Sequence, residues 1–345
     1  MNLEQSLHNI TALNAQAMND ARELHSRFIK PLGSLGELEH IAVKLAGITG
    51  HVHNNITHSA VYLFASDNGI YDEGVCSSPQ DFTRKLMLAY SDKRNAGINI
   101  LSRQSNSELR LYNLGVKNLD SHEGIITHKF MSDGTKNFLH ERAMSHETAL
   151  EAIEYGIDLV REAKNNHVDL IATGEAGMAN TTTAAACIMA ALNTRDISLI
   201  GRGAGLDDEA YSRKIRVITQ ALRLHEKNFT DPVNILSCVG GLDIAAITGV
   251  FIGGAVYHVP VIIDGVISIA GALLAYQLNN LTREYMFASH ESCEPAYNYA
   301  AGFMNLKPVL NLSMRLGEGT GAAIFIHIIR DSLTIINEMG TFDEL

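Results

Sequence analysis

The sequence predicts an α/β protein: a doubly wound parallel sheet in a Rossmann-like three-layer arrangement, with a smaller helical domain built from the chain termini. Short apolar segments recur through the middle of the chain, and each is followed by a glycine-bearing loop and then by a helical pattern. These segments are almost continuously apolar, which indicates strands covered on both faces. Alternating strand and helix units fold into a parallel sheet. The 345 residues suffice for such a core.

Six segments are expected to supply the strands together with the loops that follow them. In chain order they are 61–70 (VYLFASDNGI), 109–116 (LRLYNLGV), 169–180 (DLIATGEAGMAN), 197–208 (ISLIGRGAGLDD), 234–243 (NILSCVGGLD) and 260–266 (PVIIDGV). In a parallel sheet the loops after the strands meet at the carboxyl edge, where ligands bind. We therefore expect the glycine loops of these segments to form the ligand site.

One uncharged segment, 244–263, is long enough to be compared with a membrane span. Pro260 interrupts it and Asp264 follows it, so we expect a buried helix to about His258 and then a buried strand over 259–263. The sequence thus predicts no membrane partner.

The two ends of the chain have helical spacing, as in LEHIAVKLAGI and TGAAIFIHIIRDSLTIINEM. The predicted division is a helical segment 1–55, a large α/β domain 56–285, and a C-terminal segment 286–345. The last segment would carry a catalytic loop and a helix of the small domain.

Composition excludes several function classes. The net charge is −11 and no basic run occurs, which argues against nucleic acid as a partner. The four cysteines lie far apart and form no CxxC pair, so a structural zinc site is not expected. The polar N-terminus is not a signal peptide, and we expect a cytoplasmic protein with reduced thiols.

The loop 174–180 (GEAGMAN) is the first candidate site. Backbone N–H groups at a helix start could bind an anion there, with Asn180 or Thr181 capping the helix. A tight turn with a good cap is an equal alternative. The loop contains an acid, Glu175, and no Gly-Lys-Ser/Thr, so it is not a Walker loop. The segment 201–208 resembles a dinucleotide fingerprint only weakly, because Leu206 stands where the third glycine belongs.

The segment RLGEGTGAA, 315–323, is the second candidate site. Glu318 stands between two glycines before an apolar helix, and a carboxylate in such a loop can have the raised pKa that a general base needs. A helix N-terminal acid that complements the helix dipole is the alternative. The residues alone leave both open.

These motifs together resemble the nicotinate-nucleotide–dimethylbenzimidazole phosphoribosyltransferases, which build the lower-ligand nucleotide of cobamides. The resemblance runs almost end to end, in the family's order. It rests on KPLGSLGELE (30–39), FASDNGIYDEGVCSSPQDFT (64–83), GEAGMANTT (174–182), GRGAGLDD, VGGLDIAA (239–246), PVIIDG and RLGEGTGA. It implies transfer of phosphoribose from nicotinate mononucleotide to 5,6-dimethylbenzimidazole or a similar base. The products are nicotinate and an α-ribotide, α-ribazole 5′-phosphate, with inversion at C1′.

The resemblance also implies roles for individual residues. Glu318 matches the proposed general base, and Glu175 would face the ribose or the positive charge that develops on it. Lys214 would supply the cation that the loop lacks. No metal or cofactor is expected, because the cationic ring nitrogen of the donor becomes neutral as nicotinate leaves. The positions for phosphate and ribose are Gly174, Gly177, Met178, Ala179, Asn180, Thr181, Gly203 and Lys214, and those for the acceptor are Ser78, Gln80, Met314 and Leu316.

The chain departs from the family at three places, which leaves the acceptor open. Asn68 replaces the histidine of Asp-His-Gly, Leu242-Asp243 replaces Phe-Glu, and Ala296-Tyr297 replaces Gly-His. A phenolic acceptor (phenol or p-cresol), used by one subunit of a heterodimer, is one alternative. A non-catalytic paralogue is another. The resemblance otherwise implies a homodimer.

Overall fold

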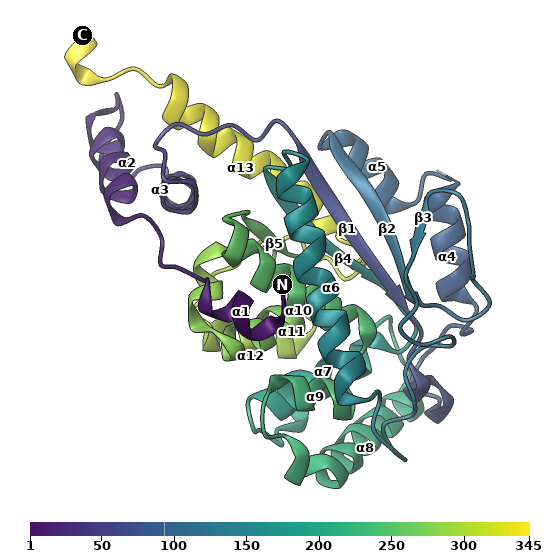
Figure 1. Ribbon diagram of the computed structural model, residues 1–345. Coiled ribbons are helices and arrows are strands. Elements are labelled where there is room, and N and C mark those ends of the chain that lie inside the picture. The colour runs from purple at the N-terminus through teal and green to yellow at the C-terminus, as the bar shows by residue number, and fades with distance from the viewer. Residues whose placement is uncertain (93) are drawn as a thin grey trace.

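A six-stranded parallel sheet forms the centre of the protein, whose computed structural model describes residues 1–92 and 94–345 (Figure 1). The strand order is β3-β2-β1-β4-β5-β6, and every neighbouring pair is parallel. This confirms the predicted α/β class. The strands are β1 (Ser59–Ser66), β2 (Ser107–Gly115), β3 (Ile125–Thr127), β4 (Leu170–Ala176), β5 (Val261–Ile263) and β6 (Met286–Ala288).

Helices cover both faces of this sheet. On one face α6 (His146–Asn165), α10 (Leu242–Tyr257) and α11 (Val266–Leu278) pack against one another. On the other, α4 (Phe82–Ser91), α5 (Gly97–Gln104) and α13 (Thr320–Glu338) contact the strands; Figure 1 shows α6 in front of the sheet and α5 behind it. The chain winds in opposite directions from the centre, so β1 and β4 form the switch point at which such sheets bind ligands.

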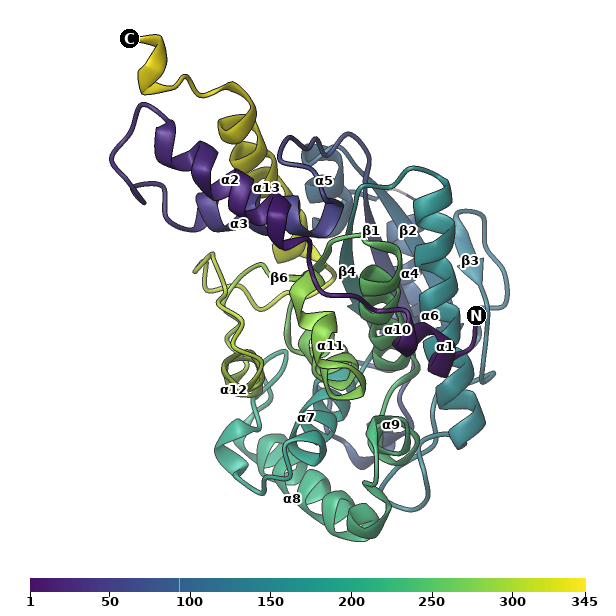
Figure 2. The same cartoon turned by 60° about the vertical axis from the view of Figure 1, so that its left-hand side comes forward.

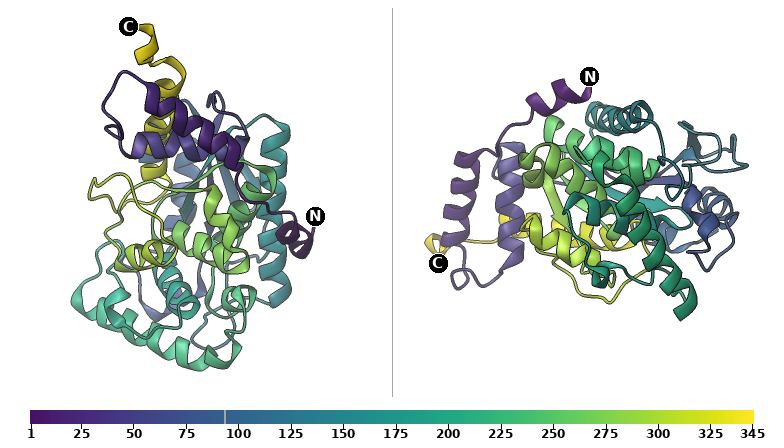
Figure 3. Two further views of the ribbon diagram at one scale, coloured as in Figure 1. Left: turned by 90° about the vertical axis from the view of Figure 1, so that its left-hand side faces the viewer. Right: turned by 90° about the horizontal axis from the view of Figure 1, so that it is seen from below.

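The remaining elements lie at the edges and ends. Helices α2 (Ala15–Arg27) and α3 (Glu37–Thr49) pack on each other and on α13, and they project from the sheet layers (Figures 2 and 3). By contrast, α1 (Leu3–His8) packs on α6 and α10. The division of the chain into the segments 1–55, 56–285 and 286–345 stays a prediction. The other elements are η1 (Gly69–Glu73), α7 (Asn180–Ala191), η2 (Ile197–Leu199), α8 (Asp208–His225), η3 (Glu226–Asn228), α9 (Pro232–Val239), η4 (Asn280–Tyr285), α12 (Pro295–Phe303) and η5 (Phe342–Glu344).

Two predicted strands are wrong. The apolar residues after 197 form the short 3-10 turn η2, and those of 234–239 belong to α9. The Asp231 side chain accepts a hydrogen bond from the Asn234 N–H at 2.9 Å and Pro232 begins the helix, which are start signals of a helix rather than of a strand. A short buried helix and a buried strand have the same apolar composition, so the pattern did not separate them.

The uncharged segment 244–263 folds as expected. Helix α10 ends at Tyr257, His258 follows in the left-handed conformation, and β5 begins at Val261. Gly249 lies directly against the Ile153 carbonyl of α6, with no room for a side chain between the two helices. Contacts on all sides explain the continuous apolar pattern. Among the described residues, no helix is long and apolar enough to cross a membrane.

Candidate active site

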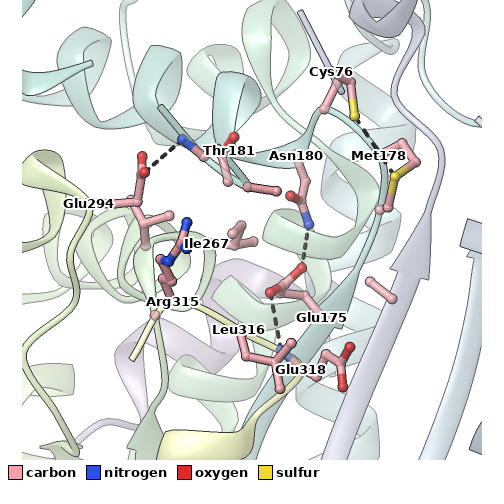
Figure 4. Close-up of a pocket in the computed structure, with 18 of the residues that line it drawn as sticks. Cys76, Glu175, Met178, Asn180, Thr181, Ile267, Glu294, Arg315, Leu316 and Glu318 are labelled. Carbon is pink, nitrogen blue, oxygen red and sulfur yellow. Dashed lines mark hydrogen bonds between the residues drawn. The ribbon is translucent and has the colours of Figure 1, made fainter. Parts of the chain in front are cut away.

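A cavity of about 240 Å³ opens at the carboxyl edge of the sheet, beside the switch point between β1 and β4 (Figure 4). Six segments from distant parts of the chain line it. They lie within 75–90, 175–181, 202–206, 265–267, 290–294 and 314–318. Both sequence-predicted glycine loops, that of Glu175 and that of Glu318, are therefore in one cavity.

Glu175 ends β4 and links the two loops. Its side chain is 8% exposed and accepts hydrogen bonds from the Asn180 side-chain amide and, at 3.4 Å, from the Glu318 backbone N–H (Figure 4). Burial raises the pKa of Glu175 to about 8, and the nearby Asp243 and Asp264 act in the same direction. Near neutral pH this carboxyl is thus largely protonated in the empty site.

The start of α7 has no side-chain cap. The N-cap is Ala179, in the left-handed conformation at φ 68°, so the expectation that Asn180 or Thr181 caps the helix is wrong. Those two side chains bond elsewhere: Asn180 donates to Glu175, and the Thr181 hydroxyl accepts from Lys214 Nζ at 3.0 Å. In the described chain, the N–H groups of Gly177, Ala179 and Thr181 have no hydrogen-bond partner. Three free donors at a helix start form an arrangement that binds anions.

Lys214 stands behind this helix start, not in the cavity wall. It is fully buried on α8, and burial lowers its pKa to about 8, with Glu294 opposing the shift. Gly203, at φ 55°, leaves no room for a side chain, since a Cβ there would lie 2.7 Å from Thr181 Oγ1. Its N–H donates to Glu294 Oε1 at 2.8 Å. The ammonium group of Lys214 therefore reaches the cavity only indirectly, through Thr181 and the loop at Gly203.

The second loop holds Glu318 in a conformation that few side chains adopt. Glu318 has φ 62° and lies between two glycines that are also left-handed. Asp264, at the end of β5, fixes this turn by accepting the Gly319 N–H at 3.1 Å and the Ala322 N–H at 3.0 Å. Burial raises the pKa of Glu318, Tyr90 opposes the shift, and Asp264 adds to it.

This geometry separates the two interpretations of Glu318. A helix N-terminal acid accepts hydrogen bonds from the first turn of its helix, but in α13 Asp264 already accepts from Gly319 and Ala322. The Glu318 side chain lines the cavity instead, and its Oε2 atom is buried without a hydrogen-bond partner among the described residues. The arrangement favours a role in chemistry.

Comparisons with known proteins agree on one family. The family model described as "Phosphoribosyltransferase" matches residues 10–345. A nicotinate-nucleotide–dimethylbenzimidazole phosphoribosyltransferase of Clostridium perfringens is 40% identical over 342 residues, which cover 99% of this chain and 94% of that protein. One of Geotalea uraniireducens is 40% identical over 343 residues, 99% of this chain and 97% of that protein. The crystal structure of CobT from Thermus thermophilus superposes with a TM-score of 0.90 at 32% identity, covering 95% of this chain and 98% of that one.

The chain belongs to this phosphoribosyltransferase family. It is an α/β enzyme of the glycosyltransferase type, as its sequence predicts.

Within this phosphoribosyltransferase, the sequence-predicted residues fall into two groups. Gln80 and Lys214 do not line the cavity, and neither does Gly174, which lies inside β4 beneath the second loop. A Cβ at Gly174 would lie 2.7 Å from the Glu318 carbonyl oxygen, so this glycine permits the two loops to meet. The predicted residues that do line the cavity are Ser78, Glu175, Gly177, Met178, Ala179, Asn180, Thr181, Gly203, Met314, Leu316 and Glu318.

Four polar or charged residues at the site were not singled out as candidates from the sequence. Asp264 positions the Glu318 loop, and Tyr90, Glu294 and Arg315 line the cavity. Arg315 forms no hydrogen bond or ion pair with any described residue, and in Figure 4 it extends toward Glu294 and Ile267. A signal existed for Asp264 and Arg315, since each flanks a quoted glycine motif. Glu294 stands two residues before the departure from the family at Ala296, and only Tyr90 reaches the site through the fold alone.

The departures from the family pattern lie behind the cavity wall. Asn68 donates to the Met178 carbonyl at 3.2 Å and accepts from Thr183, so it supports the first loop. Asp243 is buried, and burial raises its pKa to about 7. Tyr297 stacks on His290 with ring centroids 6.4 Å apart. None of Asn68, Leu242, Asp243, Ala296 and Tyr297 lines the cavity itself.

Proposed function

We propose that this phosphoribosyltransferase transfers phosphoribose from nicotinate mononucleotide to 5,6-dimethylbenzimidazole or a closely similar base. The products are an α-ribotide and nicotinate, with inversion at C1′. One arrangement carries the proposal: three unpaired N–H donors lie at the start of α7, and Glu318, whose oxygen Oε1 is not sealed from solvent, lines the same cavity. The names of the relatives support the choice of donor and acceptor.

The donor's 5′-phosphate is assigned to the start of α7. The N–H groups of Gly177, Ala179 and Thr181 donate to its oxygens, and the helix dipole favours the negative charge. Lys214 polarises Thr181 from behind through the 3.0 Å hydrogen bond. Glu175 then lies between the phosphate site and Glu318, at the level of the ribose.

The acceptor is an aromatic base bound against the apolar wall. Leu86, Phe82, Met314 and Leu316 supply apolar surface to the cavity that Glu318 also lines. Such surface favours a flat, fused ring. No observation favours a phenolic acceptor. A cytoplasmic location and a dimer are further expectations of this proposal.

The chemistry needs one proton transfer and one displacement. Glu318, in its ionised form, takes the N–H proton of the base, and the other ring nitrogen attacks C1′ with its lone pair. The bond from C1′ to the pyridine nitrogen breaks, and its electron pair stays on that nitrogen, which becomes neutral. The cationic donor favours the ionised form of Glu175, which stabilises the positive charge that develops on the ribose.

The test is a direct assay of nicotinate release. The purified protein is incubated with nicotinate mononucleotide and, in turn, 5,6-dimethylbenzimidazole, benzimidazole, adenine, phenol and p-cresol. We expect nicotinate and an equal amount of α-ribotide with the benzimidazoles, and unchanged rates in excess EDTA because the ring nitrogen of nicotinate leaves in its neutral form. Lack of nicotinate release with every acceptor would contradict the proposal. Faster release with a phenol than with the benzimidazoles would show that the acceptor is a phenol.

A further inference from the structure

Tyr90, on α4, is a buried residue whose hydroxyl has no hydrogen-bond partner. The side chain is 1% exposed and lines the cavity, and its oxygen bonds to no described residue. Buried hydroxyl groups are nearly always paired, so an unpaired one next to a reaction cavity requires an explanation. The backbone around it is well fixed, because the Asn99 side chain donates to the Tyr90 carbonyl at 2.9 Å and thereby ties α4 to α5.

The two carboxyl oxygens of Glu318 differ in their surroundings. Oε2 is sealed from solvent and has no partner, whereas Oε1 is not sealed. The sealed oxygen points to the side of the cavity formed by α4 and α5, since a Cβ on Gly97 would lie 4.0 Å from it. Tyr90 lies on the same side. The outer oxygen is therefore the one that an acceptor can reach.

We propose that Tyr90 is a positioning residue for Glu318, whose hydroxyl donates to the inner oxygen Oε2 in the loaded site and so directs the outer oxygen Oε1 at the proton of the acceptor. This inference rests on the proposed function, in which Glu318 is the general base. It assigns Tyr90 a hydrogen bond and no covalent step.

The charges around the pair support this assignment. Burial and the neighbouring Glu318 raise the pKa of Tyr90, so the phenol keeps its proton and acts only as a donor. For Glu318, burial and Asp264 raise the pKa, while Tyr90 and the Ile98 N–H at the start of α5 lower it. Glu175, from β4, touches the Glu318 backbone N–H and also acts on Tyr90. Tyr90 thus favours the ionised, basic form of Glu318.

The hydrogen bond is not complete in the empty site. Each of the two groups shifts the pKa of the other, yet neither the Tyr90 hydroxyl nor Glu318 Oε2 has a hydrogen-bond partner among the described residues. Rotation about the last bonds of either side chain completes it. An aromatic acceptor against the neighbouring Leu86 and Leu316 would exclude water and favour that rotation.

The test is the pH dependence of turnover in Tyr90→Phe, which removes only the hydroxyl. Loss of a hydrogen bond to an ionised carboxylate should lower kcat about tenfold and move the acidic limb of the kcat profile about one unit to higher pH. The sign follows because the hydroxyl stabilises the ionised base, whose pKa rises without it. The KM for nicotinate mononucleotide should stay unchanged. Tyr257→Phe is the matched control, because Tyr257 also has an unpaired hydroxyl but lies away from the cavity.

A second variant separates positioning from packing. In a Glu318→Gln background, Tyr90→Phe should cost less than about twofold, since the two residues act as one unit. Equal losses in both backgrounds, or a lower kcat with an unshifted acidic limb, would overturn the inference. A wild-type enzyme that releases no nicotinate overturns both this inference and the proposed function. An active wild type with a normal Tyr90→Phe profile overturns the inference alone.

Discussion

The loops that carry Glu175 and Glu318 have similar sequences and different structures. Both place a glutamate beside glycines before a helix, and both belong to one cavity. The Glu175 carboxyl accepts two hydrogen bonds and joins the loops, whereas the Glu318 side chain accepts none of normal geometry among the described residues. A carboxyl that is already paired serves structure and charge, and one that is held but unpaired is available to a substrate.

Replacement of Glu318 by glutamine is the strongest test of this comparison. The variant keeps the shape and removes the basicity, so we expect kcat to fall by about 10²–10⁴. The KM for nicotinate mononucleotide should change little, because the phosphate site is on another loop. Steady-state kinetics of nicotinate release measure both. A wild-type rate would make Glu175 the next candidate for the base.

Replacement of Asp264 by asparagine tests whether the turn at 318 must be fixed. Asparagine keeps one acceptor for the Gly319 and Ala322 N–H groups instead of two, so the loop should loosen. Misplacement of a catalytic group by about 1 Å can cost 10²-fold in rate, and we expect a loss of kcat of about 10–10². A circular dichroism spectrum like that of the wild type would show that the fold is intact. A full rate would mean that Asp264 does not position Glu318.

Replacement of Lys214 by methionine tests the phosphate site on the first loop. Methionine fills the buried space but cannot donate to Thr181, so the KM for nicotinate mononucleotide should rise about tenfold, with a smaller change in kcat. Competition by inorganic phosphate should weaken in parallel. If nucleotide affinity is unchanged, the phosphate does not lie at the start of α7.

Replacement of Glu175 by glutamine should have the smallest effect on turnover, less than about tenfold, because the amide keeps the hydrogen bond from Asn180 and removes only the negative charge beside the ribose. Its effect on stability is specific to pH. The pKa of Glu175 is raised to about 8, so the stability that its protonated form contributes is complete below the ordinary pKa of glutamate and is lost as pH rises through about 8. Glu175→Gln has no carboxyl to ionise at this position, so its stability does not fall for this reason as the pH rises.

Thermal unfolding from pH 5 to 9 measures that difference. A pKa of about 8 costs roughly 1.4 kcal/mol per pH unit between pH 5 and 8, so we expect the melting temperature of the wild type to fall by about 5 °C more than that of Glu175→Gln. Asp243, whose pKa is raised to about 7, titrates with the same sign in both proteins, so the difference between the two curves reports Glu175 together with its coupling to Asp243. Parallel curves would show that Glu175 is ionised in the folded enzyme.

The sequence predicted the fold class and the positions of the long strands for clear physical reasons. Segments such as VYLFAS and DLIATG are apolar on both faces and end in glycine loops, and both form central strands. The edge strands β3 and β6 have three residues each and no glycine loop follows them directly, whereas the equally short β5 is followed by the glycine of PVIIDG. The segment NILSCV shows the converse error, because the capping residue Asp231 precedes it and outweighs its apolar composition.

For the candidate site, sequence motifs located the loops but not the contacts between them. Glu175 and Glu318 were found because each stands in a glycine motif, and both line the cavity. That the Glu318 backbone donates to Glu175 depends on Gly174, whose role is visible only in three dimensions. Tyr90 lies in an ordinary helical pattern, and nothing in its neighbours along the chain indicates that it lines the cavity.

The pairing of the central strands also determines when the enzyme can first become active during its synthesis. β1 and β4 pair across more than one hundred residues, as Ser59 opposite Leu170 illustrates, and such distant pairings form slowly. Glu318 and the turn that docks on Gly174 are synthesised after all six strands of the described sheet. A growing chain can therefore complete its sheet and its phosphate site while it still lacks its base, so activity begins only when the loop of Glu318 has been made and has docked.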